Sequence, residues 1–401
     1  MREMKDSGVE WIGEIPKEWK ICRLKNYAYI MNGADFKDIQ DDNGDYPVIG
    51  SGGEFDRATK YLYDGESVLL GRKGTIDKPR YINGTFWTVD TMYYTKIKDI
   101  GIAKYLYYLC TQIQFDYYQY GSAVPSMTQR DLNSVVFPLP EIVEQENIVN
   151  YLDSKCSKID EIIEKQQAII EKLKEYKLSI ITEAVTSGIN PDVEMKDSGS
   201  VWFGSIPINW EMKRLKYVFH IQKDIAGEEG HTVLSITQKG IIPKDFSNNE
   251  GQFANSYANY QLVHKGDFAM NHMDLLTGWV DISKYEGVTS PDYRVFVLND
   301  KNGMCPEYYL YMMQMCYSAR IFYGLGQGVS GMGRWRLQAD KFLNFHIPIP
   351  PYDEQKIIAD YITDKVNHIE VEIDKRNKLV EKYQEYKKSL IYEVVTGKKE
   401  V

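Results

Sequence analysis

Residues 4–25 read MKDSGVEWIGEIPKEWKICRLK, and residues 195–216 read MKDSGSVWFGSIPINWEMKRLK. Thirteen of these 22 positions are identical at an offset of 191 residues. Self-similarity at a fixed distance along a chain indicates a repeated architecture. We name the two copies cap 1 and cap 2, and they predict that one structural plan is used twice.

A second repeat pairs residues 138–188 with residues 348–398 at an offset of 210. Both copies open with a Pro-x-Pro segment and close with a similar run of apolar residues. We name residues 20–136 block 1 and residues 213–346 block 2; their first few residues are shared with the caps, and beyond the caps the two blocks match each other poorly. The predicted order along the chain is therefore cap, block, helix, cap, block, helix.

Each copy of the second repeat is predicted to form one long helix, because its apolar residues recur at steps of seven. Prolines that cannot continue a helix precede it, and Gly188 or Gly397 follows as a C-cap. The predicted seam residues are Leu152, Ile159, Ile163, Ile170, Leu173 and Ile180, and then Ile362, Ile369, Ile373, Val380, Tyr383 and Leu390. Polar residues interrupt both seams at matched steps, where they tend to fix register: Gln166, Lys177, Arg376 and Lys387.

Two such helices packed against each other would form a coiled coil that acts as a spacer. About 40 helical residues at ~1.5 Å each give a rod of roughly 60 Å. That is longer than the ~34 Å between successive turns of one DNA groove. A rod of this length suits a split recognition site. The alternative is a pair of unrelated amphipathic helices that face solvent.

The blocks are predicted to be mixed α/β domains with substantial sheet. Residues 65–70 (GESVLL) and 266–271 (GDFAMN) both look like a turn that enters a buried strand. Helical stretches are expected at 102–118 and 306–323, each before a glycine-rich loop. The expected fold class is α+β: two mixed α/β domains joined by two long antiparallel coiled-coil helices, with a pseudo-twofold internal repeat. The expected boundaries are 1–140 and 189–350 for the domains, and 141–188 and 351–401 for the helices.

The composition indicates a globular cytoplasmic protein and permits DNA binding. The 401-residue chain has a net charge of -9, but block 1 holds 14 basic and 14 acidic residues and block 2 holds 14 and 13. The acidic excess therefore lies in the repeated segments, and either block can present a basic face to phosphates. The five cysteines are scattered without a C-x-x-C, which indicates reduced thiols and no zinc site. No apolar run approaches the ~20 residues of a membrane helix, and no signal peptide is expected.

Two loops of block 1 carry candidate DNA contacts. A glycine-flanked turn, Gly71–Thr75, places cations where phosphates or guanine edges could be met. The candidates are Arg72, Lys73, Thr75, Lys78 and Arg80 around this turn, and Ser122, Gln129 and Arg130 near the later glycine-rich loop. An ordinary solvated loop is the alternative for each of them.

Block 2 carries its own candidates, mostly in a glycine-rich loop with cations and an aromatic residue. They are Asn271, His272, Arg294, Gln327, Arg334, Trp335 and Arg336. The alternative for Trp335 is packing in the core. The alternative for Asn271 and His272 is local hydrogen bonding at the end of a strand.

The caps and helix openings resemble those of the specificity subunits of type I restriction-modification systems. The residues that carry the resemblance are the MKDSG of both caps with their tryptophans, and the paired helix openings Pro138-Leu139-Pro140 with Glu144-Gln145 and Pro348-Ile349-Pro350 with Glu354-Gln355. The similarity covers nearly the whole chain. In this family each block is a target-recognition domain that reads one half of a bipartite DNA site, so two different blocks imply an asymmetric target.

The resemblance also implies partners and cofactors. Two methyltransferase subunits and the restriction subunits would assemble on this chain, and S-adenosylmethionine, ATP and magnesium would belong to those partners. The chain itself would be a non-catalytic DNA-binding subunit in defence against foreign DNA.

Two other classes of protein are alternatives. One is a coiled-coil adaptor that binds proteins only and has no DNA specificity. The other is a self-contained methyltransferase or nuclease, but Pro350-Pro351-Tyr352 lacks the preceding Asn or Asp that a methyltransferase motif requires. No phosphate-binding loop and no nucleophile elbow is found either.

Overall fold

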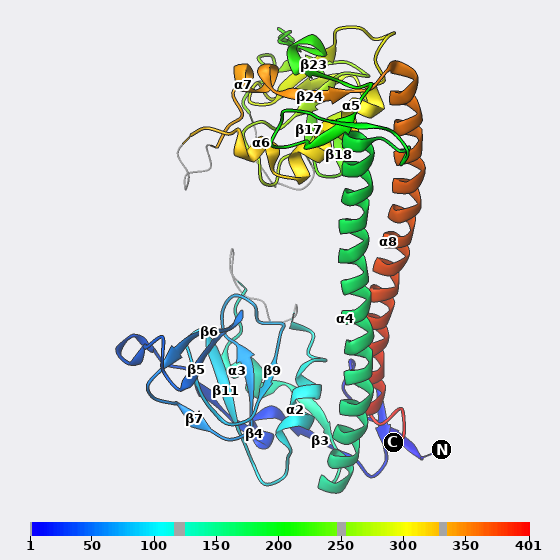
Figure 1. Ribbon diagram of the computed structural model, residues 1–401. Coiled ribbons are helices and arrows are strands. Elements are labelled where there is room, and N and C mark those ends of the chain that lie inside the picture. Colours follow the sequence, from blue (N-terminus) through cyan, green and yellow to red (C-terminus); the bar gives the residue numbers. More distant parts are fainter. Residues whose placement is uncertain (1, 116–124, 247–253, 329–334) are drawn as a thin grey trace. The chain divides into compact units, whose positions relative to one another are not determined.

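The structure is a computed structural model that describes residues 2–115, 125–246, 254–328 and 335–401 (Figure 1). The chain folds as two compact units, which we name unit 1 (Met1–Gln167 with Asn377–Val401) and unit 2 (Ala168–Arg376). Each unit contains one cap, one block and part of both long helices. The predicted segment boundaries set the helices apart from the blocks, whereas the compact units divide both helices.

Unit 1 contains cap 1 and block 1. The cap forms a hairpin of β1 (Met4–Asp6) and β2 (Glu14–Pro16), and β3 (Lys20–Arg23) pairs antiparallel with β12 (Val136–Leu139). One sheet has the order β4 (Ala28–Asn32), β11 (Met92–Ile97), β8 (Ser67–Gly71), β9 (Arg80–Ile82). A second has the order β6 (Gly53–Ala58), β5 (Tyr46–Gly50), β10 (Thr85–Thr88), β7 (Tyr63–Asp64). The short helices are α1 (Leu24–Tyr27), α2 (Ala103–Cys110) and α3 (Gln129–Ser134), with a 3₁₀ turn at Lys37–Ile39.

Unit 2 contains cap 2 and block 2. The cap hairpin is β13 (Met195–Asp197) with β14 (Ser205–Pro207), and β15 (Glu211–Arg214) pairs antiparallel with β24 (His346–Ile349). The main sheet has the order β16 (Phe219–Gln222), β23 (Arg294–Leu298), β20 (Phe268–Met270), β21 (Val280–Ile282). Two ribbons join β17 (Leu234–Thr237) to β18 (Gly240–Pro243) and β19 (Gln261–Val263) to β22 (Gly287–Thr289). The helices are α5 (Pro306–Ser318), α6 (Ile321–Gly324) and α7 (Ala339–Asn344), with a 3₁₀ turn at Leu215–Tyr217.

The two blocks share one sheet topology. In both sheets, the first strand along the chain (β4 or β16) lies at one edge. The last strand along the chain (β11 or β23) lies between it and the third strand (β8 or β20), and these pairs are antiparallel. The strands predicted at 65–70 and 266–271 are confirmed as β8 and β20, and they hold the same place in the order. Outside this sheet the blocks differ, because block 1 adds four more strands in one sheet and block 2 adds two separate ribbons.

The predicted block helices are shorter in the structure. Of the stretch expected at 102–118, residues 102–115 are described, and α2 is the α-helix within them; the Thr111 hydroxyl donates to the Tyr108 carbonyl at 2.6 Å and closes its last turn. The stretch expected at 306–323 is broken between α5 and α6. Arg320 lies there in the left-handed region with φ 58°, which interrupts the helix.

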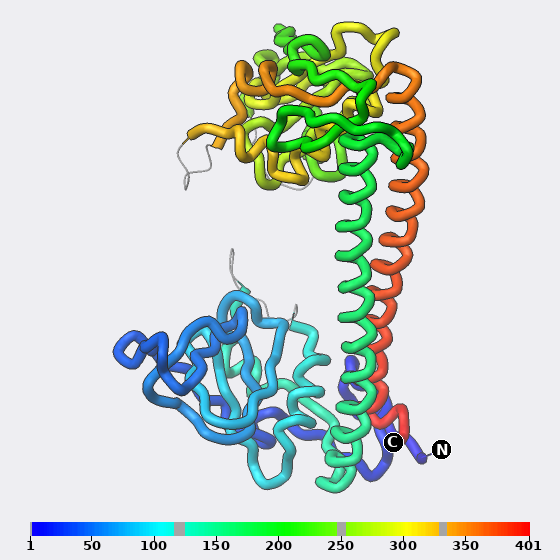
Figure 2. Tube along the Cα trace, in the orientation of Figure 1, coloured from blue at the N-terminus to red at the C-terminus, as the bar shows by residue number. Residues whose placement is uncertain are grey.

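The long helices are α4 (Ile142–Ser187) and α8 (Tyr352–Val395), and they lie side by side (Figure 2). In unit 1, Leu152 near the start of α4 shares a core with Leu390 near the end of α8. In unit 2, Val185 at the end of α4 shares a core with Ile362 near the start of α8. The helices are therefore antiparallel, and all twelve predicted seam residues are buried or half-buried.

The seam lysines are ion-paired across the helices. Lys177 Nζ donates to Glu370 at 3.0 Å in unit 2, and Lys387 Nζ donates to Asp160 at 2.6 Å in unit 1. The two pairs are equivalent, since each residue has its counterpart 210 positions away. The predicted C-caps also hold, because Gly188 and Gly397 have φ values of +76° and +73°.

Candidate nucleic-acid interface

The repeated cap tryptophans fix each block to the start of its own helix. Trp19 Nε1 donates to Glu144 at 2.8 Å, and Trp210 Nε1 donates to Glu354 at 2.9 Å. Both tryptophans are buried, and both acceptors belong to the repeated Glu-Gln pair of the helix openings. Two of the repeated features that carry the resemblance, the second cap tryptophan and the helix-opening glutamate, thus contact each other in both units.

A buried tyrosine in each block links the strand that precedes one long helix to the end of the other long helix. Tyr105 donates to the carbonyls of Pro138 at 3.2 Å and Val395 at 3.4 Å. Its equivalent, Tyr308, donates to the carbonyls of Pro348 and Val185. Burial raises the pKa of both phenols well above the usual value, so they stay protonated as donors. Each block is therefore held at the start of one long helix and the end of the other.

In block 1 the predicted turn Gly71–Thr75 follows directly from β8. A Cβ on Gly71 would overlap the Thr75 carbonyl, and Gly74 has a φ of +82°, so both glycines are required. The Arg72 carbonyl accepts from the amide of Met127 at 3.1 Å. This bond brings the turn beside α3, where two other candidates, Gln129 and Arg130, lie.

The side chains of these candidates differ in availability. Lys73 and Arg130 are exposed, whereas Arg72 is half-buried and donates from Nη1 to the Asp90 carbonyl at 3.2 Å. Gln129 donates from Nε2 to the Ile30 carbonyl at 2.6 Å, which makes it a support for β4. The other placements are these: Lys78 exposed in the turn before β9, Thr75 half-buried, Arg80 half-buried in β9, and Ser122 outside the described residues.

A shallow basic cleft beside α3 was missed by the sequence reasoning. It measures about 440 Å³ and is lined by Arg23, Lys25 and Arg130 together with polar residues. Arg23 and Lys25 belong to cap 1, far from Arg130 in the sequence. The signal was present in the repeat, because cap 2 carries the same Arg-x-Lys at Arg214 and Lys216.

In block 2, Asn271 and His272 follow β20 as the turn follows β8. The Asn271 Oδ1 accepts from the amides of Met273 and Asp274, both at 3.1 Å, so this side chain shapes the turn as the alternative reading predicted. The His272 carbonyl accepts from the amide of Leu337 at 3.0 Å. Within the described part of the chain, the buried Nδ1 of His272 has no hydrogen-bond partner.

The imidazole of His272 is neutral. Burial, followed by the charges of Arg294, Arg336 and Lys223, lowers its pKa to about 4. A neutral imidazole has one donor and one acceptor nitrogen, which a base edge can match. His272 therefore keeps hydrogen-bonding capacity that the fold does not use.

Arg294, a predicted DNA contact, lies inside block 2. Only 6% of the residue is exposed, Nη2 donates to the Leu337 carbonyl at 2.8 Å, and the guanidinium lies 5.1 Å from the centre of the Phe342 ring. Burial lowers its pKa to about 10, and the group remains a cation inside the block. Its position in the central strand β23 turned it inward, which charge alone could not reveal.

The remaining candidates of block 2 lie around the second glycine-rich loop. Trp335 is half-buried and donates to the Tyr323 carbonyl at 2.8 Å, so it packs into the block as the alternative reading predicted. Gln327 and Arg336 exchange backbone hydrogen bonds, with Gln327 exposed and Arg336 half-buried. Arg334 lies outside the described residues.

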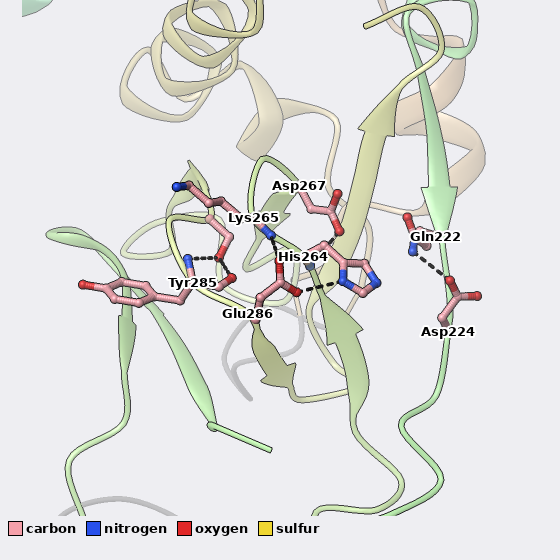
Figure 3. A network of polar contacts seen from close by, with 8 residues as sticks. Gln222, Asp224, His264, Lys265, Asp267, Tyr285 and Glu286 are labelled. Carbon is pink, nitrogen blue, oxygen red and sulfur yellow. Dashed lines mark hydrogen bonds and ion pairs between the residues drawn. The ribbon is translucent and has the colours of Figure 1, made fainter. Parts of the chain in front are cut away.

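A polar network fixes the opposite end of β20 (Figure 3). Glu286 accepts from the Lys265 amide at 2.9 Å and contacts His264 Nδ1 at 2.9 Å, while Asp267 accepts from the His264 amide. The Lys265 amide and the His264 ring hold the pKa of Glu286 below its ordinary value. These carboxylates are satisfied locally, so the network belongs to the scaffold of block 2.

Among the described residues, no three His, Cys, Asp or Glu side chains lie together as metal ligands. In the same part of the chain, the long helices are too polar for any of them to span a membrane.

Comparison with known proteins places this geometry in a family. The model of the type I restriction modification DNA specificity domain matches residues 16–178 and again residues 207–382. The MjaVIII specificity subunit of Methanocaldococcus jannaschii is 24% identical over 431 residues, covering 96% of this chain and 93% of that subunit. The EcoDI specificity subunit of Escherichia coli is 22% identical over 292 residues, covering 71% of this chain and 61% of that subunit.

A solved structure supports the fold. It was determined in work on the complex assembly and conformational transition of the type I R-M system, and it matches with a TM-score of 0.65 at 12% identity over 95% of this chain and 98% of that chain. The two family matches begin at Pro16 and Pro207, which are equivalent positions of the two caps. The chain therefore belongs to the family of type I restriction-modification specificity subunits, whose function is DNA sequence recognition.

Proposed function

We propose that this chain reads the two halves of an asymmetric bipartite DNA site within a type I restriction-modification complex, one half with each block. The observation that carries the proposal is the position of β8 and β20. Both strands hold the same place in the shared sheet and end in turns of different sequence. Equivalent placement with different side chains is what recognition of two different half-sites requires.

The long helices set the spacing of the two half-sites in this proposal. The 46 residues of α4 correspond to about 69 Å of helix at ~1.5 Å per residue. The ion pairs Lys177–Glu370 and Lys387–Asp160 support a fixed register between α4 and α8, because they join positions that are equivalent at the offset of 210.

The partners are two methyltransferase subunits and the restriction subunits, and the chain itself is not catalytic. The names of the related proteins support this, since they are specificity subunits of type I restriction enzymes. S-adenosylmethionine, ATP and magnesium are bound by the partners, and the complex acts in the cytoplasm. The solvent-facing sides of α4 and α8, where acidic residues outnumber basic ones, are the proposed docking surfaces.

The test is methylation mapping of a genome that expresses this chain with its methyltransferase. The expected result is one asymmetric motif with two specified halves and a fixed spacer, absent when this gene is deleted. A protein adaptor without DNA specificity predicts the same methylation after reversal of the charges at Arg72, Lys73 and Arg336. Retention of the motif without this gene would contradict the proposal.

A further inference from the structure

The strand registers assign equivalent positions in the two blocks. In block 1, Leu70 pairs with Tyr93 of β11, which pairs in turn with Asn32. In block 2, Met270 pairs with Arg294 of β23. Residues of the edge strands β4 and β16 correspond at the cap offset of 191. Through their partners in β11 and β23, this aligns Tyr93 with Arg294 and therefore Leu70 with Met270.

Two residues further along, Arg72 of block 1 therefore corresponds to His272 of block 2. A second observation gives the same correspondence independently. The Arg72 carbonyl accepts from the Met127 amide at 3.1 Å, and the His272 carbonyl accepts from the Leu337 amide at 3.0 Å. Met127 and Leu337 are themselves equivalent at the offset of 210 that relates the helices.

The strand register and the hydrogen bond to the backbone carbonyl are thus shared at this position, while the side chain differs in charge and in hydrogen-bonding pattern. Arg72 uses Nη1 on the Asp90 carbonyl, and no other acceptor for its guanidinium is found among the described residues. His272 keeps its buried Nδ1 without a partner in the part of the chain that the structure describes. Both side chains retain capacity for a ligand that the fold itself does not satisfy.

We propose that Arg72 and His272 are equivalent specificity-determining residues, each contacting a base edge in the half-site that its own block reads. This inference rests on the proposed function and deepens it. Because the two residues share a register position and a carbonyl hydrogen bond, the choice of side chain at this position contributes directly to the difference between the half-sites. A guanidinium favours the two acceptors of guanine, while a neutral imidazole offers one donor and one acceptor.

The experiment uses the complete complex and reads the methylated motif of each variant. R72A should relax one base position in one half-site, and H272A should relax one base position in the other half-site. The expected loss of discrimination is on the order of 10- to 100-fold at that position. The exposed residues Lys60 and Lys239 provide matched controls, because K60A and K239A remove surface charge from the same blocks and should leave the motif unchanged.

Three results separate the outcomes. An unchanged motif in both variants, or relaxation of both halves by either variant, would overturn the assignment. A wild-type complex without any bipartite motif would instead overturn the proposed function. If H272A fails to fold, H272Q keeps a neutral polar group at the position and carries the same expectation.

Discussion

Block 1 and block 2 share a four-stranded sheet, the same anchoring tyrosine and the same tryptophan contact to a helix opening. They differ where the third strand of that sheet ends, with Arg72 and Lys73 in one block and His272 and Met273 in the other. The chain therefore repeats the contacts that fix each block to the long helices. The residues that follow the third strand of the sheet differ between the blocks.

The largest expected effect on stability tests whether the two cores where a block meets the long helices contribute equally to the free energy of unfolding. Leu152 and Ile362 are equivalent and fully buried at the junction of block and helix. L152A and I362A should each lower the free energy of unfolding by about 2–5 kcal/mol through lost burial and a residual cavity. Chemical denaturation of the full chain measures both. A cost below ~1 kcal/mol for one of them would show that the two cores are not equivalent.

The glycines that end α4 and α8 should differ in the cost of substitution. Both cap a long helix, but they are 209 residues apart, one short of the repeat offset. A Cβ on Gly397 would overlap the ring of Pro16, whereas a Cβ on Gly188 would lie 3.3 Å from Trp210 Cζ2. Both residues have positive φ, so alanine costs about 1–2 kcal/mol at either position. G397A should therefore destabilise more than G188A in thermal unfolding. Equal shifts in Tm would mean that cap 1 moves aside freely.

The pH dependence of stability should distinguish the blocks at the position of Arg72 and His272. The pKa of His272 is lowered from 6.5 to about 4 when folded, so the unfolded chain binds this proton first as the pH falls. Stability should thus decrease between pH 6.5 and 4, with up to about one proton taken up on unfolding. H272Q removes this contribution, while R72Q should retain it. Identical pH slopes for H272Q and the wild type would contradict the burial of a neutral imidazole.

The smallest expected effect concerns the ion pairs between the helices. Lys387–Asp160 and Lys177–Glu370 are partly exposed, so K387A and K177A should each cost no more than about 1 kcal/mol. Their proposed role is to fix the register between α4 and α8, and the spacer length of the methylated motif measures that register. A charge-swapped pair, K387D with D160K, should restore the wild-type spacer if register depends on the pair.

The sequence predicted the repeated parts well because periodicity and identity report directly on packing. The helix seams from Leu152 to Leu390, the glycine C-caps and the strands β8 and β20 follow from such patterns. The side-chain placements were harder to predict. Arg294 is turned inward by the pleat of β23, and Trp335 packs on Tyr323, because tertiary contacts rather than residue type decide which way a side chain points.

The cleft lined by Arg23, Lys25 and Arg130 could not be predicted either, because its residues are far apart in the sequence. These cations are brought together by the pairing of β3 with β12 and the packing of α1 on α3. Separation along the chain hid that proximity. The repeated Arg-x-Lys of the two caps could have suggested a shared role, but it could not show which block residue would join it.

The most direct test of the account is a graft of block 1 in place of block 2, joined at the repeated cap and Pro-x-Pro segments, followed by methylation mapping of the complex. If the blocks recognise DNA and the repeated segments only position the blocks, the complex with the grafted chain should methylate a symmetric motif. Both halves of that motif should match the half-site read by block 1. An asymmetric motif that still contains the half-site lost with block 2 would contradict the account.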